Sequence, residues 1–203
     1  MMAAIAIALV VSGCASTQRL SDSDRVALKS AKINETVSKG NLFLLAPSGA
    51  NIGLMFGAVG GLAASGSIDD SQQAFGSYLD KNAISIEKIV REEVESALRA
   101  SGKLAISSGD AAGAAIVNVS VPQYGFGVTH LLSSSVVPVM QIKCDIVDAS
   151  GKLLWSANER MLPSIASPME STTWTTLHDD PKQIEQRWRL AAKHLATNII
   201  KEL

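Results

Sequence analysis

The chain has 203 residues, and its 18 Lys and Arg residues nearly balance its 19 Asp and Glu residues, which gives a net charge of −1. This length suffices for one domain with a hydrophobic core and is short for two. The balanced charge excludes the strongly basic surface that binding to nucleic acid requires. Nucleic acid is therefore not expected among the partners.

The chain begins with the pattern of an export signal. Residues 3–11 form an unbroken apolar run, which matches the core of a signal peptide and is far shorter than the roughly 20 residues of a membrane-spanning helix. No Lys or Arg precedes the run, and the paired Met1-Met2 leaves the true start open. We predict a signal peptide over residues 1–13.

The apolar run ends in Val11-Ser12-Gly13-Cys14, which resembles the lipobox of bacterial lipoproteins. The resemblance implies that Cys14 carries diacylglycerol, becomes the first residue of the mature chain and anchors it in a membrane through its acyl chains, palmitate among them. An ordinary cleavage site that happens to include a cysteine is the alternative.

No aspartate follows Cys14; Ala15 and Ser16 stand there instead. By resemblance to enterobacterial sorting rules this favours the outer membrane, with the protein facing the periplasm. Residues 14–24 are mostly polar and are expected to form a lipidated tether, and residues 25–203 a single domain.

The most unusual segment carries no charge from Gly40 to Ile68. Within it Gly49, Gly53, Gly57 and Gly61 recur at intervals of four. On a helix this interval places the glycines in one stripe, where another backbone can approach closely, as in small-xxx-small contacts between membrane helices. We call residues 49–66 the glycine zipper and predict that its four glycines form an interaction surface.

Three interpretations of the glycine zipper stay open: a helix that contacts a partner or a membrane, an internal core helix, and a flexible loop. The fully apolar part, Ile52 to Ala64, has 13 residues and would be about 20 Å long as a helix. Because the hydrocarbon core of a bilayer is about 30 Å thick, a complete span is not expected.

Two amphipathic helices are predicted from helical spacing of apolar residues. The first runs from about Asn82 to Ala100 and is ended by Gly102. The second begins after Asp180-Pro181, which supplies an N-cap acid and a proline at the first helical position, and continues to the C-terminus.

Residues 104–160 have the alternation of β-strands, most clearly in 115–121 and 140–146, and Asp148–Gly151 supplies a turn. Cys144 falls in the apolar set and is expected to act as a small hydrophobic side chain. The fold class is therefore α+β: an antiparallel meander of about four to five strands, two covering helices and a glycine-zipper helix. Arg25–Val37 and Leu42–Leu45 are further candidate strands, and Pro163–Leu177 is expected to be an exposed loop.

The sequence contains no recognisable catalytic constellation. It lacks a phosphate-binding loop, a dinucleotide fingerprint, and the GxSxG, HExxH and CxxC motifs. Its three histidines, His130, His178 and His194, lie far apart in the sequence. No metal, cofactor, small-molecule substrate or enzymatic activity is expected. A cell-wall enzyme with an unrecognised site is an alternative, with His130, His178 and Glu93 as the residues to test.

The order of elements after residue 82 includes Ser101-Gly102-Lys103 and the strand end Asp148-Ala149-Ser150-Gly151-Lys152-Leu153-Leu154-Trp155. It resembles the periplasmic lipoprotein domains of the curli-secretion and penicillin-binding-protein-activator type, and the resemblance covers about 120 residues. It implies a domain that binds other envelope proteins. The glycine zipper lies outside it.

The function expected from these observations is that of a non-enzymatic envelope lipoprotein, which acts as a scaffold or assembly factor through contacts with itself or another envelope protein. The alternative from a different class is an oligomeric secretion or pore component that inserts into the membrane through the glycine zipper.

Overall fold

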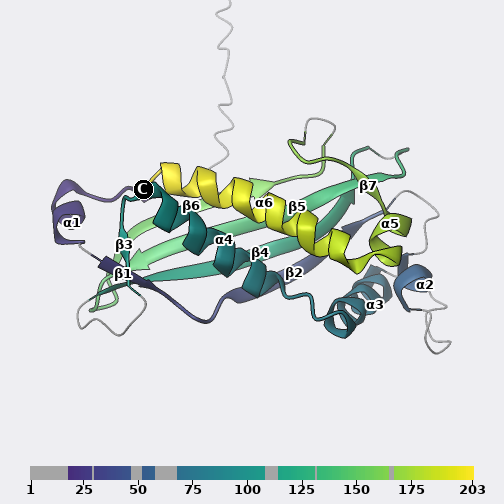
Figure 1. The fold of residues 1–203 in the computed structure, drawn as a ribbon, viewed down its shortest axis with the longest axis horizontal. Coiled ribbons are helices and arrows are strands. Elements are labelled where there is room, and N and C mark those ends of the chain that lie inside the picture. The colour runs from purple at the N-terminus through teal and green to yellow at the C-terminus, as the bar shows by residue number, and fades with distance from the viewer. Residues whose placement is uncertain are drawn as a thin grey trace, which may run out of the picture.

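The computed structural model describes residues 18–28, 30–46, 52–57, 68–107, 114–130, 132–164 and 167–203. They form an α+β fold in which an open sheet carries two long helices on one face (Figure 1). The α+β prediction is confirmed. The predicted signal peptide and Cys14 lie outside the described residues.

Within the described residues the sheet has seven strands, in the order β3-β1-β4-β5-β6, with β2 beside β4 and β7 beside β5. The strands are β1 (Ser30–Ile33), β2 (Ser38–Leu45), β3 (Ala105–Ile106), β4 (Ala115–Val128), β5 (Ser135–Val147), β6 (Leu153–Met161) and β7 (Thr172–Thr173). Strands β4, β5 and β6 form the antiparallel meander that the alternation predicted.

The sheet is larger than expected and mixed, because β1 and β2 both pair with β4 in parallel and β1 also pairs with β3 in parallel. One edge of β4 holds β1 first and β2 further along. Where β2 begins to pair with β4, the pairing of β4 with β5 is irregular from Ser120 to Gln123, around Pro122, which has no N–H to donate. Gly40 of β2 lies so close that a Cβ there would be 2.2 Å from the Pro122 carbonyl oxygen.

The two long helices are α4 (Ile86–Ser101) and α6 (Pro181–Lys201). The side chain of Ser85 caps α4 at its N-terminus, and Gly102 ends it in the left-handed conformation, with φ 63°. The Asp180 side chain accepts a hydrogen bond from the Lys182 amide at the start of α6. Both predicted helices are thus confirmed, although α4 begins at Ile86 rather than near residue 82.

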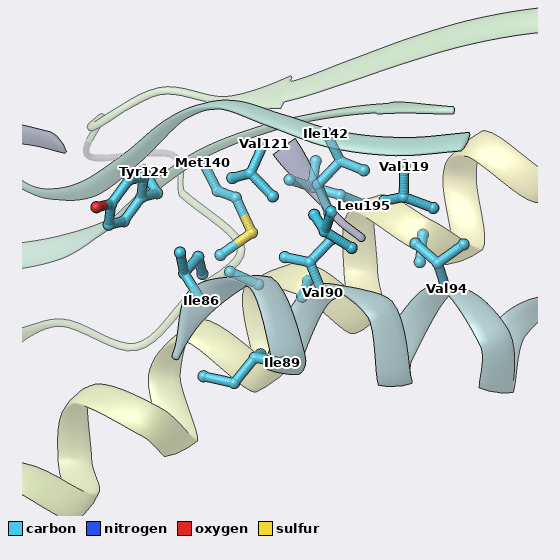
Figure 2. Close-up of a cluster of buried hydrophobic side chains, with 14 of the residues drawn as sticks. Ile86, Ile89, Val90, Val94, Val119, Val121, Tyr124, Met140, Ile142 and Leu195 are labelled. Atoms are coloured by element: carbon cyan, nitrogen blue, oxygen red, sulfur yellow. The ribbon is translucent and has the colours of Figure 1, made fainter. Parts of the chain in front are cut away.

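The main core lies between these helices and the sheet. Figure 2 shows Ile86, Val90 and Val94 of α4 beneath side chains of β4 and β5, among them Val121 and Ile142. These residues are at most 2% exposed. Apolar burial of this kind is the main stabilising contribution to a domain of this size.

Four shorter helices complete the described fold: α1 (Asp22–Ala27), α2 (Ile52–Gly57), α3 (Ile68–Lys81) and α5 (Trp174–Asp179). Helix α1 shows that the strand expected over Arg25–Val37 was wrong in its first part, whereas Leu42–Leu45 does lie in a strand. Helix α3 was not expected. Strand β7 falls inside the segment 163–177 that was expected to be a loop, and α5 begins inside it and extends to Asp179. In Figure 1, α2, α3 and α5 gather at the end of the sheet opposite α1.

Candidate functional site

The described part of the glycine zipper is helix α2, which contains Gly53 and Gly57. Gly49 and Gly61 lie outside the described residues. Gly53 is buried together with Ile52 and Phe56, while Leu54 on the other side of the helix is 52% exposed. One face of α2 is therefore turned into the domain.

Aromatic packing holds α2 in place. The ring of Phe56 is 4.8 Å from that of Phe75 and 4.9 Å from that of Tyr78, both on α3, in edge-to-face geometry. It also lies 5.5 Å from the ring of His178 on α5. Ile52–Gly57 thus fits the interpretation of an internal helix. The role of the four glycines as an interaction surface stays a prediction.

Glu93, one of the residues considered for chemistry, belongs to a cluster of ion pairs around Arg189. Arg189 of α6 donates to Glu92 at 2.9 Å and to Glu93 at 3.0 Å, both on α4, and to Glu185 at 3.1 Å. These carboxylates raise the pKa of the Arg189 guanidinium above its usual value. Glu93 therefore helps to fasten the two helices together.

The three histidines lie on different elements. His130 is in the β4–β5 connection, beside an open hollow of about 330 Å³ lined largely by serines. The ring of His178 packs against the aromatic rings of Phe56 on α2 and Tyr78 on α3. Its Nδ1 is 3.0 Å from an oxygen of Asp179. His194 lies on α6. The part of the chain that the structure describes contains no group of three potential metal ligands.

Cys144 is fully buried on the core face of β5. Burial raises the pKa of its thiol to about 12, so the thiol stays protonated and unreactive at physiological pH. The expectation that Cys144 acts as a small hydrophobic side chain agrees with this environment.

The face of the sheet opposite α4 and α6 offers a broad surface. Its centre is polar and internally paired through three contacts: Asn34 Nδ2 to Asn118 Oδ1 at 3.0 Å, Gln141 Nε2 to Asn158 Oδ1 at 3.0 Å, and Lys143 Nζ to Asp145 Oδ2 at 2.7 Å. Polar groups that pair with each other in this way are compatible with solvent, although the second carboxylate oxygen of Asp145, Oδ1, is buried and has no hydrogen-bond partner among the described residues. We call this surface the open face.

Near one end of the open face the polar pattern gives way to apolar side chains. Ile116 pairs with Val147, and Val147 pairs with Leu153 after a register shift that follows Ile146, so the three residues lie side by side across β4, β5 and β6. Ile116 is 39% exposed, Leu153 is 37% exposed and Val147 is half-buried. We call these three residues the apolar row.

The chain just after the predicted lipid site is fastened beside this row. Gln18 exchanges two backbone hydrogen bonds with Ser156 on the outer edge of β6, at 2.9 and 3.1 Å. The Gln18 side chain donates to the carbonyl of Leu153 at 3.1 Å, and Leu20 is 9% exposed. Part of the segment expected to be a tether is thus attached to the domain.

Helix α1 continues this attachment. The side chain of Ser21 caps it, Lys152 forms an ion pair with Asp24 at 3.1 Å, and Arg25 donates to the carbonyl of Leu203 at 2.8 Å. The hydrogen bonds from Ser21 and Lys152 lower the pKa of Asp24. The pairing therefore persists at any pH near neutrality.

The opposite edge of the sheet is β2, which pairs with β4 on one side and, among the described strands, with none on the other. Leu42 and Leu44 pack against the core, whereas Phe43 and Leu45 alternate with them. Leu45 is 36% exposed and Phe43 is partly exposed. An edge strand with free backbone groups and exposed apolar side chains is a pairing site for another chain. We call this region the β2 edge.

No helix within the described ranges is long and apolar enough to cross a bilayer.

No protein-family model and no curated protein matches the chain. Among solved structures, a variant of the PelC dodecamer from Paraburkholderia phytofirmans is similar over 86% of this chain and 85% of that chain, with 13% identity and a TM-score of 0.40. Protein XCC0632 from Xanthomonas campestris, of the family model DUF330, is similar over 85% of this chain and 89% of that chain, with 14% identity and a TM-score of 0.38. Likeness of this degree assigns neither family nor function.

The surfaces described above were missed by the sequence analysis for identifiable reasons. Ile116 stands among the polar residues of its strand, which was a signal, but the apolar row becomes visible only when the register of three strands is known. No local pattern marks Gln18 as a strand partner. In β2 four apolar residues follow one another, 42–45, so the alternation that separates Leu42 from Phe43 was hidden.

Proposed function

We propose that this protein is a lipid-anchored lipoprotein of the cell envelope, attached through Cys14 to the periplasm-facing side of the outer membrane, and that it acts as a non-enzymatic scaffold through protein contacts at the β2 edge. The observation that carries the proposal is the placement of the two sheet edges. The chain next to Cys14 is bound to β6, and β2, on the other side of the sheet, has no partner on its outer side among the described strands.

This placement suits a scaffold because the anchor and the docking edge do not compete for space. An added strand at β2 would gain backbone hydrogen bonds along an eight-residue strand and would cover Phe43 and Leu45. Main-chain pairing supplies affinity, and the pockets for alternate side chains supply selectivity.

Lipidation is tested by labelling cells with a radioactive or clickable fatty acid and fractionating their membranes. The native protein is expected to incorporate label and to sediment with the outer membrane, and the Cys14→Ser variant is expected to do neither. A native protein without label, or a Cys14→Ser variant that fractionates like the native protein, would remove the anchor from the proposal.

Docking is tested in the lipidated protein with a photo-crosslinking amino acid at Leu45. The expected result is a discrete adduct with one envelope protein or with a second copy, and its loss when Phe43→Lys is added, because a charge on an edge strand opposes strand addition. The matched control places the crosslinker at Leu190 of α6, which is 58% exposed. Equal adducts from both positions, or none from Leu45, would contradict a β2 docking site.

A further inference from the structure

The contacts of Gln18 limit how far the folded domain can lie from its anchor. Cys14 precedes Gln18 by four residues, and an extended chain spans at most about 3.6 Å per residue, so the two Cα atoms are within about 14 Å of each other. Gln18 itself is bound by the two backbone bonds to Ser156 and the side-chain bond to Leu153. This bound holds for any conformation of residues 15–17.

The apolar row begins beside Gln18. Leu153 contacts Gln18 directly, Val147 is its partner on β5 and Ile116 is the next partner on β4. Neighbouring strands are about 4.8 Å apart, and Leu153 lies three residues, about 10 Å, along β6 from Ser156, the partner of Gln18. The three residues of the row therefore lie within about 18 Å of Gln18. Among the described residues they are the exposed or half-buried apolar residues on the open face nearest to Gln18.

The side chains around the row suit the boundary between phospholipid headgroups and acyl chains. Lys152 precedes Leu153 and is 61% exposed even though it pairs with Asp24. Arg19 follows Gln18 and is exposed. Exposed apolar side chains flanked by long cationic ones are typical of surfaces that rest in the interfacial layer of a bilayer.

We propose that the apolar row is a membrane-contact surface, which rests on the phospholipid bilayer that holds the lipid of Cys14. The inference rests on the lipidation proposed above. The bilayer is the occupant because Cys14 lies within about 14 Å of Gln18, and among the described residues this row is the part of the open face beside Gln18 that carries exposed apolar side chains. Contact at this end of the β6 edge turns the β2 edge away from the membrane.

The test uses the mature lipidated protein in vesicles of phosphatidylethanolamine and phosphatidylglycerol, with and without bromine on the acyl chains. Bromine quenches only indole rings that reach the bilayer. Leu153→Trp supplies the reporter, and Leu190→Trp, on the helix-covered side, is the matched control. The buried native tryptophans give the background, which is measured in the parent protein.

We expect the fractional quenching of the added tryptophan to be about twofold or more larger in Leu153→Trp than in Leu190→Trp. Adding Ile116→Glu to Leu153→Trp is expected to reduce it to the level of the control, because a carboxylate opposes entry into the interfacial layer. Equal quenching at the two positions, or quenching unaffected by Ile116→Glu, overturns the membrane contact.

The same measurement separates failure of this inference from failure of the anchor. If fatty-acid labelling shows that Cys14 is not lipidated, the thiol of Cys14 is coupled to a maleimide phospholipid in the vesicles, since Cys144 is buried. Strong quenching at Leu153→Trp would then support the contact surface although the natural anchor is absent. Absence of quenching in the coupled protein would reject the contact surface itself.

Discussion

Removal of the Phe56 ring is the sharpest test of whether the uncharged segment belongs to the domain. Phe56 is 8% exposed, and its ring lies 4.8 to 6.2 Å from those of Phe75, Tyr78, His178 and Trp174. Truncation of a buried phenylalanine to alanine costs about 3–5 kcal/mol. Because short helices at the end of a domain can partly close the cavity, we expect Phe56→Ala to cost about 3 kcal/mol. This corresponds to a Tm lower by about 6–12 °C for a domain of this length.

The measurement is urea unfolding of the mature chain with Cys14→Ser, followed by the emission of the buried tryptophans. Leu54→Ala is the matched control, because Leu54 is on the same helix and is 52% exposed; its cost should stay below about 0.5 kcal/mol. If Phe56→Ala unfolds like its parent, or if both variants lose the same free energy, then α2 is not held by this aromatic cluster. The interpretation of the glycine zipper as a membrane-touching helix would then gain support.

Three further predictions follow from single residues. Burial raises the pKa of the Cys144 thiol to about 12, so the unfolded state loses this proton at a lower pH than the folded state. The free energy of unfolding should therefore fall by up to about 1.4 kcal/mol per pH unit above pH 9. In Cys144→Ala, unfolding measured as a function of pH should lack this contribution. Gly125 has φ 147°, and a Cβ there would be 1.8 Å from the backbone oxygen of Phe43. Gly125→Ala should therefore displace β2. In the same urea assay it should cost more free energy of unfolding than Gly102→Ala, for which about 1 kcal/mol is expected. Arg189→Met should lower the free energy of unfolding by roughly 1 kcal/mol, and this loss should shrink in high salt.

The elements that the sequence predicted are those with local signals. Helix α6 has an N-cap acid, a proline and a long apolar stripe, and the meander has clear alternation and a turn at Asp148–Gly151. Helix α3 was missed because few of its side chains are buried, among them Phe75 and Leu79, and because Gly76 is a poor helix former in the middle of the segment. Helix α5 was missed because six residues are too few to establish a helical period.

The parallel strands could not be predicted from local patterns. Strand β1 has four residues and pairs with Ala115–Val117, more than 80 positions away in the chain. Its partner depends on the path of the whole chain rather than on its own sequence. The alternation in β4 and β5 indicated that one face of the sheet is polar. The apolar row could not be foreseen, since it consists of one residue from each of three strands and depends on their register.

The attachment of Gln18 and α1 gives the proposed scaffold a limited reach. From Gln18 to β2 there are four strand spacings, about 19 Å, and the far end of β2 lies eight residues further along the strands, about 27 Å. The straight distance from Gln18 to Leu45 is therefore about 33 Å, and the connection to Cys14 adds at most about 14 Å. A partner that pairs with β2 must therefore expose its docking segment within roughly 50 Å of the bilayer. A long flexible tether would set no such limit, because the domain could then leave the membrane. The few residues that follow the proposed lipid site thus restrict the partners of the β2 edge to proteins that are themselves held close to the membrane.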